Sequence, residues 1–146
     1  MFVMNEGTLE VPASWKDETI NMLTTVRGGG SGLSFTISRD TLPWGMGFAS
    51  FAKKEIDALA ASLKEYRQLA HEPVEVDGRE AVMSEFRWMS AQGPIHQCMV
   101  ITARDQRALV FTASMQGLLS EEQKHQVLAL IATFRFSQDS TEAVAD

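Results

Sequence analysis

Cysteine, tyrosine and basic residues are scarce in this 146-residue sequence, which has one cysteine, one tyrosine and three histidines. A single cysteine cannot form an internal disulfide, and this is typical of a reducing compartment. Thirteen lysines and arginines against nineteen aspartates and glutamates give a formal net charge of -6. Because nucleic acids and anionic membrane surfaces attract positive charge, the composition disfavours both as partners.

Long apolar runs are also missing. The first seven residues contain no basic group followed by an apolar stretch, and no cysteine lies near the start. No window approaches the roughly 18 apolar residues that a membrane-spanning helix needs. We therefore expect no secretory signal, no lipid anchor and no stable membrane association, which predicts a cytoplasmic protein.

The composition that remains is that of a globular protein, with 45% hydrophobic and 22% charged residues. The length predicts one domain, over residues 1–136, and we expect the polar tail 137–146 to be frayed. Eight methionines are present. Methionine is flexible and polarizable, so this excess indicates either an adaptable apolar binding surface or a loosely specified core.

Seven segments rich in β-branched and aromatic residues predict strands. They are Thr8–Val11, Thr19–Val26, Leu33–Arg39, Val74–Val76, Ala81–Met89, Ile95–Ala103 and Ala108–Met115. The short links between several of them predict antiparallel neighbours. The glycine-rich segment Gly28–Gly32 leads into a strand rather than a helix, so it predicts a hairpin connection and not a phosphate-binding loop.

Two segments have helical periodicity. Phe48–Ala70 carries one apolar stripe and is followed by Pro73, which predicts its end. A second helix begins with a capping box at Ser120, and its apolar stripe runs from Val127 to Phe134. The order of elements predicts an α+β fold, an antiparallel β-sheet with two main α-helices.

Candidate chemistry is sparse. The three histidines lie in different predicted elements without a local ligand spacing, so we expect no metal site and no cofactor. Cys98 lies in a predicted strand, where a buried, inert thiol is the favoured interpretation. A nucleophile pair with His96, on the same strand face, stays open, but nothing in the sequence supplies an oxyanion nest. We therefore expect no enzyme.

An uncharged strand face is more informative. In Leu33–Arg39 the apolar residues alternate with a row of hydroxyl side chains. The row consists of Ser34, Thr36 and Ser38. If Leu23 joins the core, Ile20 and Met22 lie beside this row on the neighbouring strand. Gln97 adds an amide to the same face.

Ordinary solvated sheet faces favour charged residues, so two interpretations of this uncharged face stay open. A partner covers it, or helices bury both faces of the sheet. Aliphatic groups interleaved with serine, threonine and glutamine are what a transmembrane helix meets inside a bundle. A partner on this face would then be a membrane segment shielded from water.

Four segments, in this order and spacing, resemble the Eag chaperones of bacterial type VI secretion. They are Trp15–Leu23, Leu33–Asp40, Val76–Ala81 and Phe86–Trp88. These chaperones belong to the DcrB-like family, and the resemblance covers about residues 5 to 135. It implies a PsbP-like α/β sandwich, and a homodimer that binds the N-terminal transmembrane segments of a toxic effector beside its PAAR domain before loading onto the secretion spike.

The resemblance also implies which residues form the effector-binding groove. They are Ile20, Met22, Ser34, Thr36, Ser38, Leu63 and Gln97. Glu55 matches a helix position where we expect glutamine, and a buried carboxylate there is costly unless it is protonated or paired. We therefore predict a non-enzymatic chaperone. The alternative is a non-catalytic binding module of the same fold that docks a folded partner, which a charged groove would favour.

Overall fold

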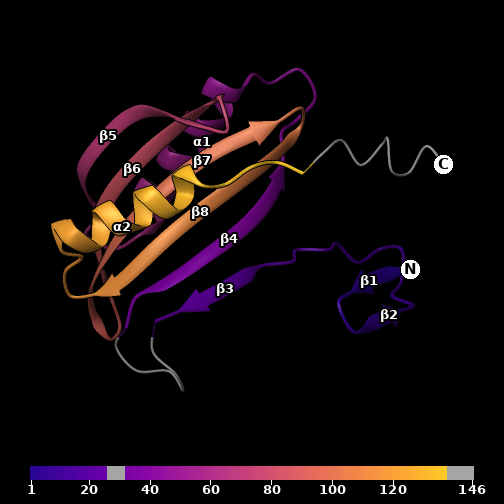
Figure 1. The fold of residues 1–146 in the computed structure, drawn as a ribbon, viewed down its shortest axis with the longest axis horizontal. Coiled ribbons are helices and arrows are strands. Elements are labelled where there is room, and N and C mark those ends of the chain that lie inside the picture. The colour runs from indigo at the N-terminus through magenta and orange to yellow at the C-terminus, as the bar shows by residue number, and fades with distance from the viewer. Residues whose placement is uncertain (26–31, 138–146) are drawn as a thin grey trace.

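The computed structural model describes residues 1–25 and 32–137, and a six-stranded antiparallel sheet organises them. The strand order is β3-β4-β8-β7-β6-β5 (Figure 1). The strands are β3 (Asn21–Thr24), β4 (Ser34–Thr41), β5 (Arg67–Val76), β6 (Arg79–Ser90), β7 (Gly93–Arg104) and β8 (Arg107–Gln116). A separate two-stranded hairpin is formed by β1 (Phe2–Met4) and β2 (Gly7–Leu9). The predicted α+β class is confirmed.

One helix packs on each face of the sheet. Behind the sheet in Figure 1, α1 (Phe48–Ser62) packs with a cluster that includes Phe86 and Ile101, while α2 (Glu121–Ala132) lies in front. The α2 cluster holds the other set of alternating strand residues, including Phe35 and Phe111. The apolar face of β4 therefore packs on the α2 side, and its hydroxyl face looks toward the α1 side.

The second helix begins as the sequence predicts. The Ser120 hydroxyl accepts a hydrogen bond from the Gln123 backbone N–H at 3.1 Å, and the Gln123 side-chain oxygen accepts one from the Ser120 N–H at 2.9 Å. The helix ends at Ala132, so Phe134 lies beyond it rather than within its stripe. Phe134 still packs edge-on against Phe111, at 5.3 Å between ring centroids.

The first helix is shorter than its apolar stripe predicts. A helix over Phe48–Ala70 is wrong beyond Ser62, because Leu63 is extended and Glu65 has a φ of +54°. A left-handed residue ends the helical path, and the chain turns into β5. Leu63 and Tyr66 nevertheless pack into the α1-side cluster. Their spacing thus imitates a continuing helical stripe although the backbone has changed direction.

The prediction of only Val74–Val76 as a strand missed most of β5, which includes Pro73. A proline lacks the N–H needed by an inner strand, but β5 is an edge strand of the sheet, where the loss is tolerated. The remaining predicted strands occur within a few residues of their expected bounds, and β1 was not predicted. Val26, Gly28–Ser31 and 138–146 lie outside the described residues. No helix of the described chain is long and apolar enough to cross a bilayer.

Candidate functional site

An uncharged surface lies on the α1 side of the sheet, across β3, β4 and β8. We call it the open face. Its side chains are Met22, Ser34, Thr36, Ser38, Val110, Thr112 and Ser114. The register sets Met22, Thr36 and Thr112 side by side, so their side chains share one face of the sheet. The members on β4 and β8 are half-buried, because α1 packs mainly over β6 and β7.

The β3 side of the open face carries two exposed aliphatic side chains. Met22 is 65% exposed, and Ile20, just before β3, is 59% exposed. The pairing of Asn21 with Ile37 places Ile20 opposite Ser38 if the register continues by one residue. The structure therefore brings Met22 beside the hydroxyl row, and Ile20 lies at the same edge, just before β3. Leu23 points to the opposite face with Phe35 but remains 58% exposed at this edge strand.

Gln97 forms the β7 border of the open face. Its amide oxygen accepts a hydrogen bond from the Trp88 indole N–H at 2.8 Å, and its amide nitrogen donates to the Ser114 hydroxyl at 2.7 Å. Ser114 in turn lies opposite Ser34. These bonds fix the side-chain orientation of Gln97 and tie the border at β6 and β7 to the hydroxyl residues.

The hydroxyl groups of Ser34 and Ser38 make no hydrogen bond within residues 1–25 and 32–137, while Thr36 donates weakly to the Thr112 carbonyl at 3.5 Å. A half-buried hydroxyl without a protein partner bonds water or a bound molecule. The open face thus offers donors and acceptors within an otherwise apolar, uncharged surface.

The two predicted helix residues take different positions. Leu63 follows the last residue of α1 and packs into the α1-side cluster. Glu55 is half-buried, and burial followed by the nearby Asp40 carboxylate raises the pKa of Glu55 above its ordinary value. Asp40 lies two residues beyond Ser38 on the same face of β4, so Glu55 lies near that end of the open face. It forms no ion pair within the described chain.

Sequence reasoning missed the contribution of β8 to this surface. Thr112 and Ser114 alternate with the buried Phe111 and Ala113, which is the same pattern of hydroxyl and apolar residues that marked β4. The pattern was visible, but only the strand order shows that β8 is the neighbour of β4. Trp88 was missed because its hydrogen bond to Gln97 crosses between strands.

The second candidate, a nucleophile pair of Cys98 and His96, does not form among the described residues. His96 Nε2 lies 2.7 Å from a Glu85 carboxylate oxygen, and its Nδ1 accepts a hydrogen bond from the Leu119 N–H at 2.8 Å. Both ring nitrogens are therefore used elsewhere. Cys98 is fully buried, and burial followed by the Glu85 charge raises the pKa of its thiol to about 11.

We expect the native Cys98 thiol to resist alkylation at pH 8, because the thiolate is the reactive form and is rare three units below the pKa. Incubation with a maleimide, followed by mass spectrometry, should show little modification until urea unfolds the chain. Rapid labelling of folded protein would contradict the buried placement of Cys98.

Family comparison extends over nearly the whole described chain. The family model described as DcrB matches residues 6–133. The chain belongs to the DcrB family. This confirms the family expected from the sequence resemblance, and it agrees with the α+β sheet and helices of the described structure.

Three individual proteins are similar to this DcrB-family chain. Effector EagT6 of Pseudomonas aeruginosa is 25% identical over 89 residues, which are 60% of this chain and 62% of that protein. A crystal structure of the Pseudomonas aeruginosa protein PA94, of unknown function, has a TM-score of 0.76 at 20% identity and covers 94% of this chain and 96% of its own. This likeness shows the same fold.

A weaker likeness connects the chain to the solution structure of cyanobacterial PsbP from Synechocystis. The TM-score is 0.46 at 11% identity, over 78% of this chain and 77% of that one. The family match and the likeness to PA94 carry the fold assignment without it.

Proposed function

We propose that this DcrB-family protein is a cytoplasmic, non-enzymatic chaperone of type VI secretion. It binds the N-terminal transmembrane segments of a PAAR-containing toxic effector and shields them from water until the effector is loaded onto the secretion spike. The similarity to Effector EagT6 supports this role, together with the family resemblance of the motifs. The homodimer that the resemblance to the Eag chaperones implies is the proposed active form.

The open face is the observation that carries the proposal. The half-buried hydroxyl groups of Ser34 and Ser38 have no hydrogen-bond partner among the described residues. They lie near the exposed aliphatic side chains of Ile20 and Met22, and the surface carries no formal charge until Asp40. A charged surface would favour the alternative of a module docking a folded polar partner. An uncharged surface favours an apolar helix whose few polar groups need partners.

Binding energy would come mainly from apolar area removed from water, at about 25 cal/mol per Å². Ser34, Thr36 and Ser38 would satisfy polar groups of the bound helix, and Gln97 and Leu63 would border it. Burial against such a helix would raise the pKa of Glu55 further, because desolvation disfavours its charged form and the nearby Asp40 charge acts in the same direction. Protonated Glu55 would then act as the neutral hydrogen-bonding group that glutamine provides in the resembling family.

The test is co-expression of this chain with an effector fragment that contains its PAAR domain and first transmembrane segments. We expect the fragment to be soluble and to copurify with the chain, and to aggregate without it, because the apolar segments are then exposed to water. Size-exclusion chromatography with light scattering of the free chain should give the mass of a dimer.

A fragment from which the transmembrane segments are deleted is the matched control, and it should not copurify. Equal solubility of the intact fragment with and without this chain would refute the chaperone function. Equal capture of the deleted fragment would instead favour the alternative, docking to a folded domain.

A further inference from the structure

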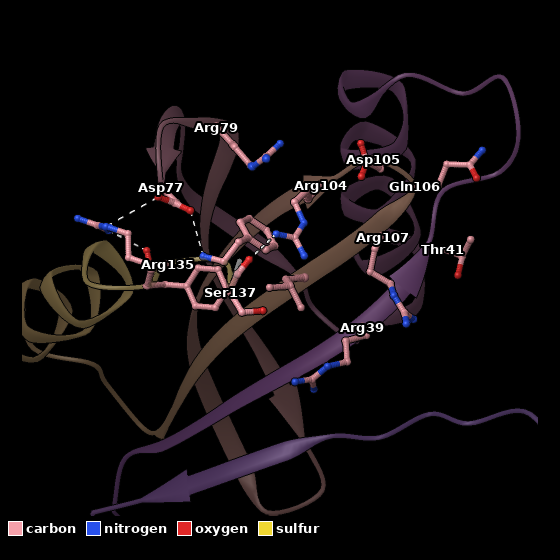
Figure 2. A pocket seen from close by; sticks show the side chains of 13 residues that line it. Arg39, Thr41, Asp77, Arg79, Arg104, Asp105, Gln106, Arg107, Arg135 and Ser137 are labelled. Carbon is pink, nitrogen blue, oxygen red and sulfur yellow. Dashed lines mark hydrogen bonds and ion pairs between the residues drawn. The ribbon is translucent and has the colours of Figure 1, made fainter. Parts of the chain in front are cut away.

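Arginines gather at the end of the sheet where β7 turns into β8. They line an open cavity of about 1120 Å³ on the face of the sheet that α2 covers (Figure 2). Five of the lining residues are arginines and two are aspartates. The arginines are Arg39, Arg79, Arg104, Arg107 and Arg135. Such a concentration is unexpected in a chain whose formal net charge is -6. It creates a local positive field in an otherwise acidic protein.

Strand register sets three of these arginines in one row. Arg104 on β7 pairs directly with Arg107 on β8, and the neighbouring pair Ala81 and Thr102 places Arg79 beside Arg104 at the end of β6. Like charges directly opposite each other on neighbouring strands are destabilising. A bound anion would remove this cost.

Internal ion pairs engage few of the guanidinium groups. Arg39 donates to the backbone carbonyl oxygens of Ile37 and Thr19, and Arg104 donates to that of Ser137, which leaves other N–H groups of both side chains for a ligand. Among the described residues, Arg135 forms the one ion pair of the cavity, with Asp77 at 3.8 Å. The Asp77 carboxylate also accepts a hydrogen bond from the Phe136 backbone N–H at 3.0 Å. Arg79 and Arg104 lie over the Phe136 ring, at 5.2 Å and 4.7 Å from its centroid, which holds both groups in place.

Carboxylates suit this cavity better than phosphates. Phosphate sites usually add backbone N–H groups of a helix N-terminus or nest. Neither Gly47 nor Ser120, the N-caps of α1 and α2, lines the cavity. The C-terminal end of α2 leads into it instead: Arg135 donates to the carbonyl oxygen of Ala132 at 2.9 Å. The negative end of the helix dipole disfavours the double charge of a phosphate more than the single charge of a carboxylate.

The shape of the cavity suits an extended ligand. The arginines are spread from β4 to β6, a span of about three interstrand spacings, or roughly 14 Å. A single small anion would reach two or three of them, whereas several carboxylates along a chain reach them all. Leu109, Phe134 and Phe136 supply an apolar floor for the stems of such side chains.

We propose that this cavity binds an acidic polypeptide segment of a partner protein, through aspartate or glutamate side chains that pair with Arg39, Arg79, Arg104 and Arg107. The site lies on the α2 side of the sheet, opposite the open face. An acidic segment in this cavity would therefore not compete for the surface proposed for a transmembrane helix.

Fluorescence anisotropy with a fluorescein-labelled decapeptide of alternating glutamate and serine tests the proposal on the full chain at low ionic strength. We expect saturable binding that weakens with salt, and no binding of the decapeptide with glutamine in place of glutamate. The double variant R79Q/R107Q should raise the Kd about tenfold, because each exposed guanidinium–carboxylate pair contributes a few-fold.

The double variant K64Q/R67Q is the matched control, since it removes the same charge from exposed residues outside the cavity. It should change the Kd less than about twofold, and circular dichroism should show both double variants folded. Absence of binding, or an equal loss in both double variants, would overturn the proposal. Competition by tripolyphosphate at concentrations below those of the unlabelled acidic peptide would overturn the carboxylate assignment in favour of a phosphate ligand.

Discussion

Glu85→Ala should lower the free energy of unfolding by about 3 kcal/mol or more, the usual loss when one partner of a buried ion pair is removed. One carboxylate oxygen of Glu85, on β6, forms an ion pair with the Lys124 ammonium group at 2.7 Å. Its second carboxylate oxygen lies 2.7 Å from His96 Nε2. Its side chain is 8% exposed. The truncation would leave the His96 ring and Lys124 of α2 without their common partner.

The position of the proton on His96 explains why this loss is large. Because Nδ1 accepts the Leu119 N–H, the ring hydrogen is on Nε2 and is donated to Glu85. Glu85 on β6 is therefore linked to His96 on β7 and to Lys124 on α2, and His96 is linked in turn to the Leu119 N–H just before α2. Urea unfolding monitored by circular dichroism should show a lower midpoint at an unchanged slope.

Glu80→Ala, on the same strand but exposed, is the control and should change stability by no more than about 0.5 kcal/mol. A loss below about 1 kcal/mol in Glu85→Ala would show that the buried network contributes little. Such a result would mean that apolar packing, including that of Val127 and Ile131, is what mainly holds α2 on the sheet.

Acid should weaken the same network. Burial by itself raises the pKa of Glu85, but the hydrogen bonds from Lys124 and His96 and the charge of Lys124 outweigh it and hold that pKa below its ordinary value. A carboxyl with a lowered folded-state pKa stabilises the fold above its unfolded-state pKa of about 4.3, and this contribution is lost as the pH falls through the folded value. The stability difference between the wild type and Glu85→Gln should therefore shrink below about pH 4.

Ser38→Asp should abolish capture of the effector fragment while leaving the chain folded. Ser38 is half-buried on β4, the central strand of the open face, beside Val110 and at the end of the hydroxyl row nearest Asp40. A carboxylate placed there would lose its water when an apolar helix covers it, without a cation to compensate. We expect affinity to fall at least about 30-fold, equivalent to roughly 2 kcal/mol of uncompensated desolvation.

Copurification of the co-expressed fragment measures this loss, and thermal unfolding verifies that the variant is folded. Ser50→Asp adds the same charge at an exposed position of α1 outside the open face, so capture should persist. Ser38→Ala should reduce capture only modestly, because it removes one hydroxyl and adds no charge. Undiminished capture by Ser38→Asp would place the client helix elsewhere on the protein.

Local patterns predicted most elements but not where one of them ends. The capping box at Ser120 was sufficient to predict the start of α2, and the alternation of residues was sufficient to predict β4, β6, β7 and β8. Each of these patterns depends only on residues that are close in the sequence. The end of α1 was not predictable from the apolar stripe. Leu63 and Tyr66 are apolar for contacts with the sheet, and these contacts do not depend on a helical backbone.

The choice between core and surface for the methionines also needed the tertiary structure. Met83 and Met99 are buried in the two core clusters, while Met22 is exposed on the open face. Some of the methionines thus fill the core, whereas Met22 contributes to the surface. Strand periodicity gives the relative facing of neighbours, but it does not say which face a helix covers.

The amino-acid sequence by itself determined the α+β class, the family and the alternation that separates a hydroxyl row from an apolar row, since all three are written in local order and spacing. Only the tertiary structure decided that β8 completes the open face, that Glu85 joins His96 to Lys124, and that arginines from β4, β6, β7 and β8 line one cavity. These groupings depend on strand order and helix placement. They join residues far apart in the chain, which no local pattern connects.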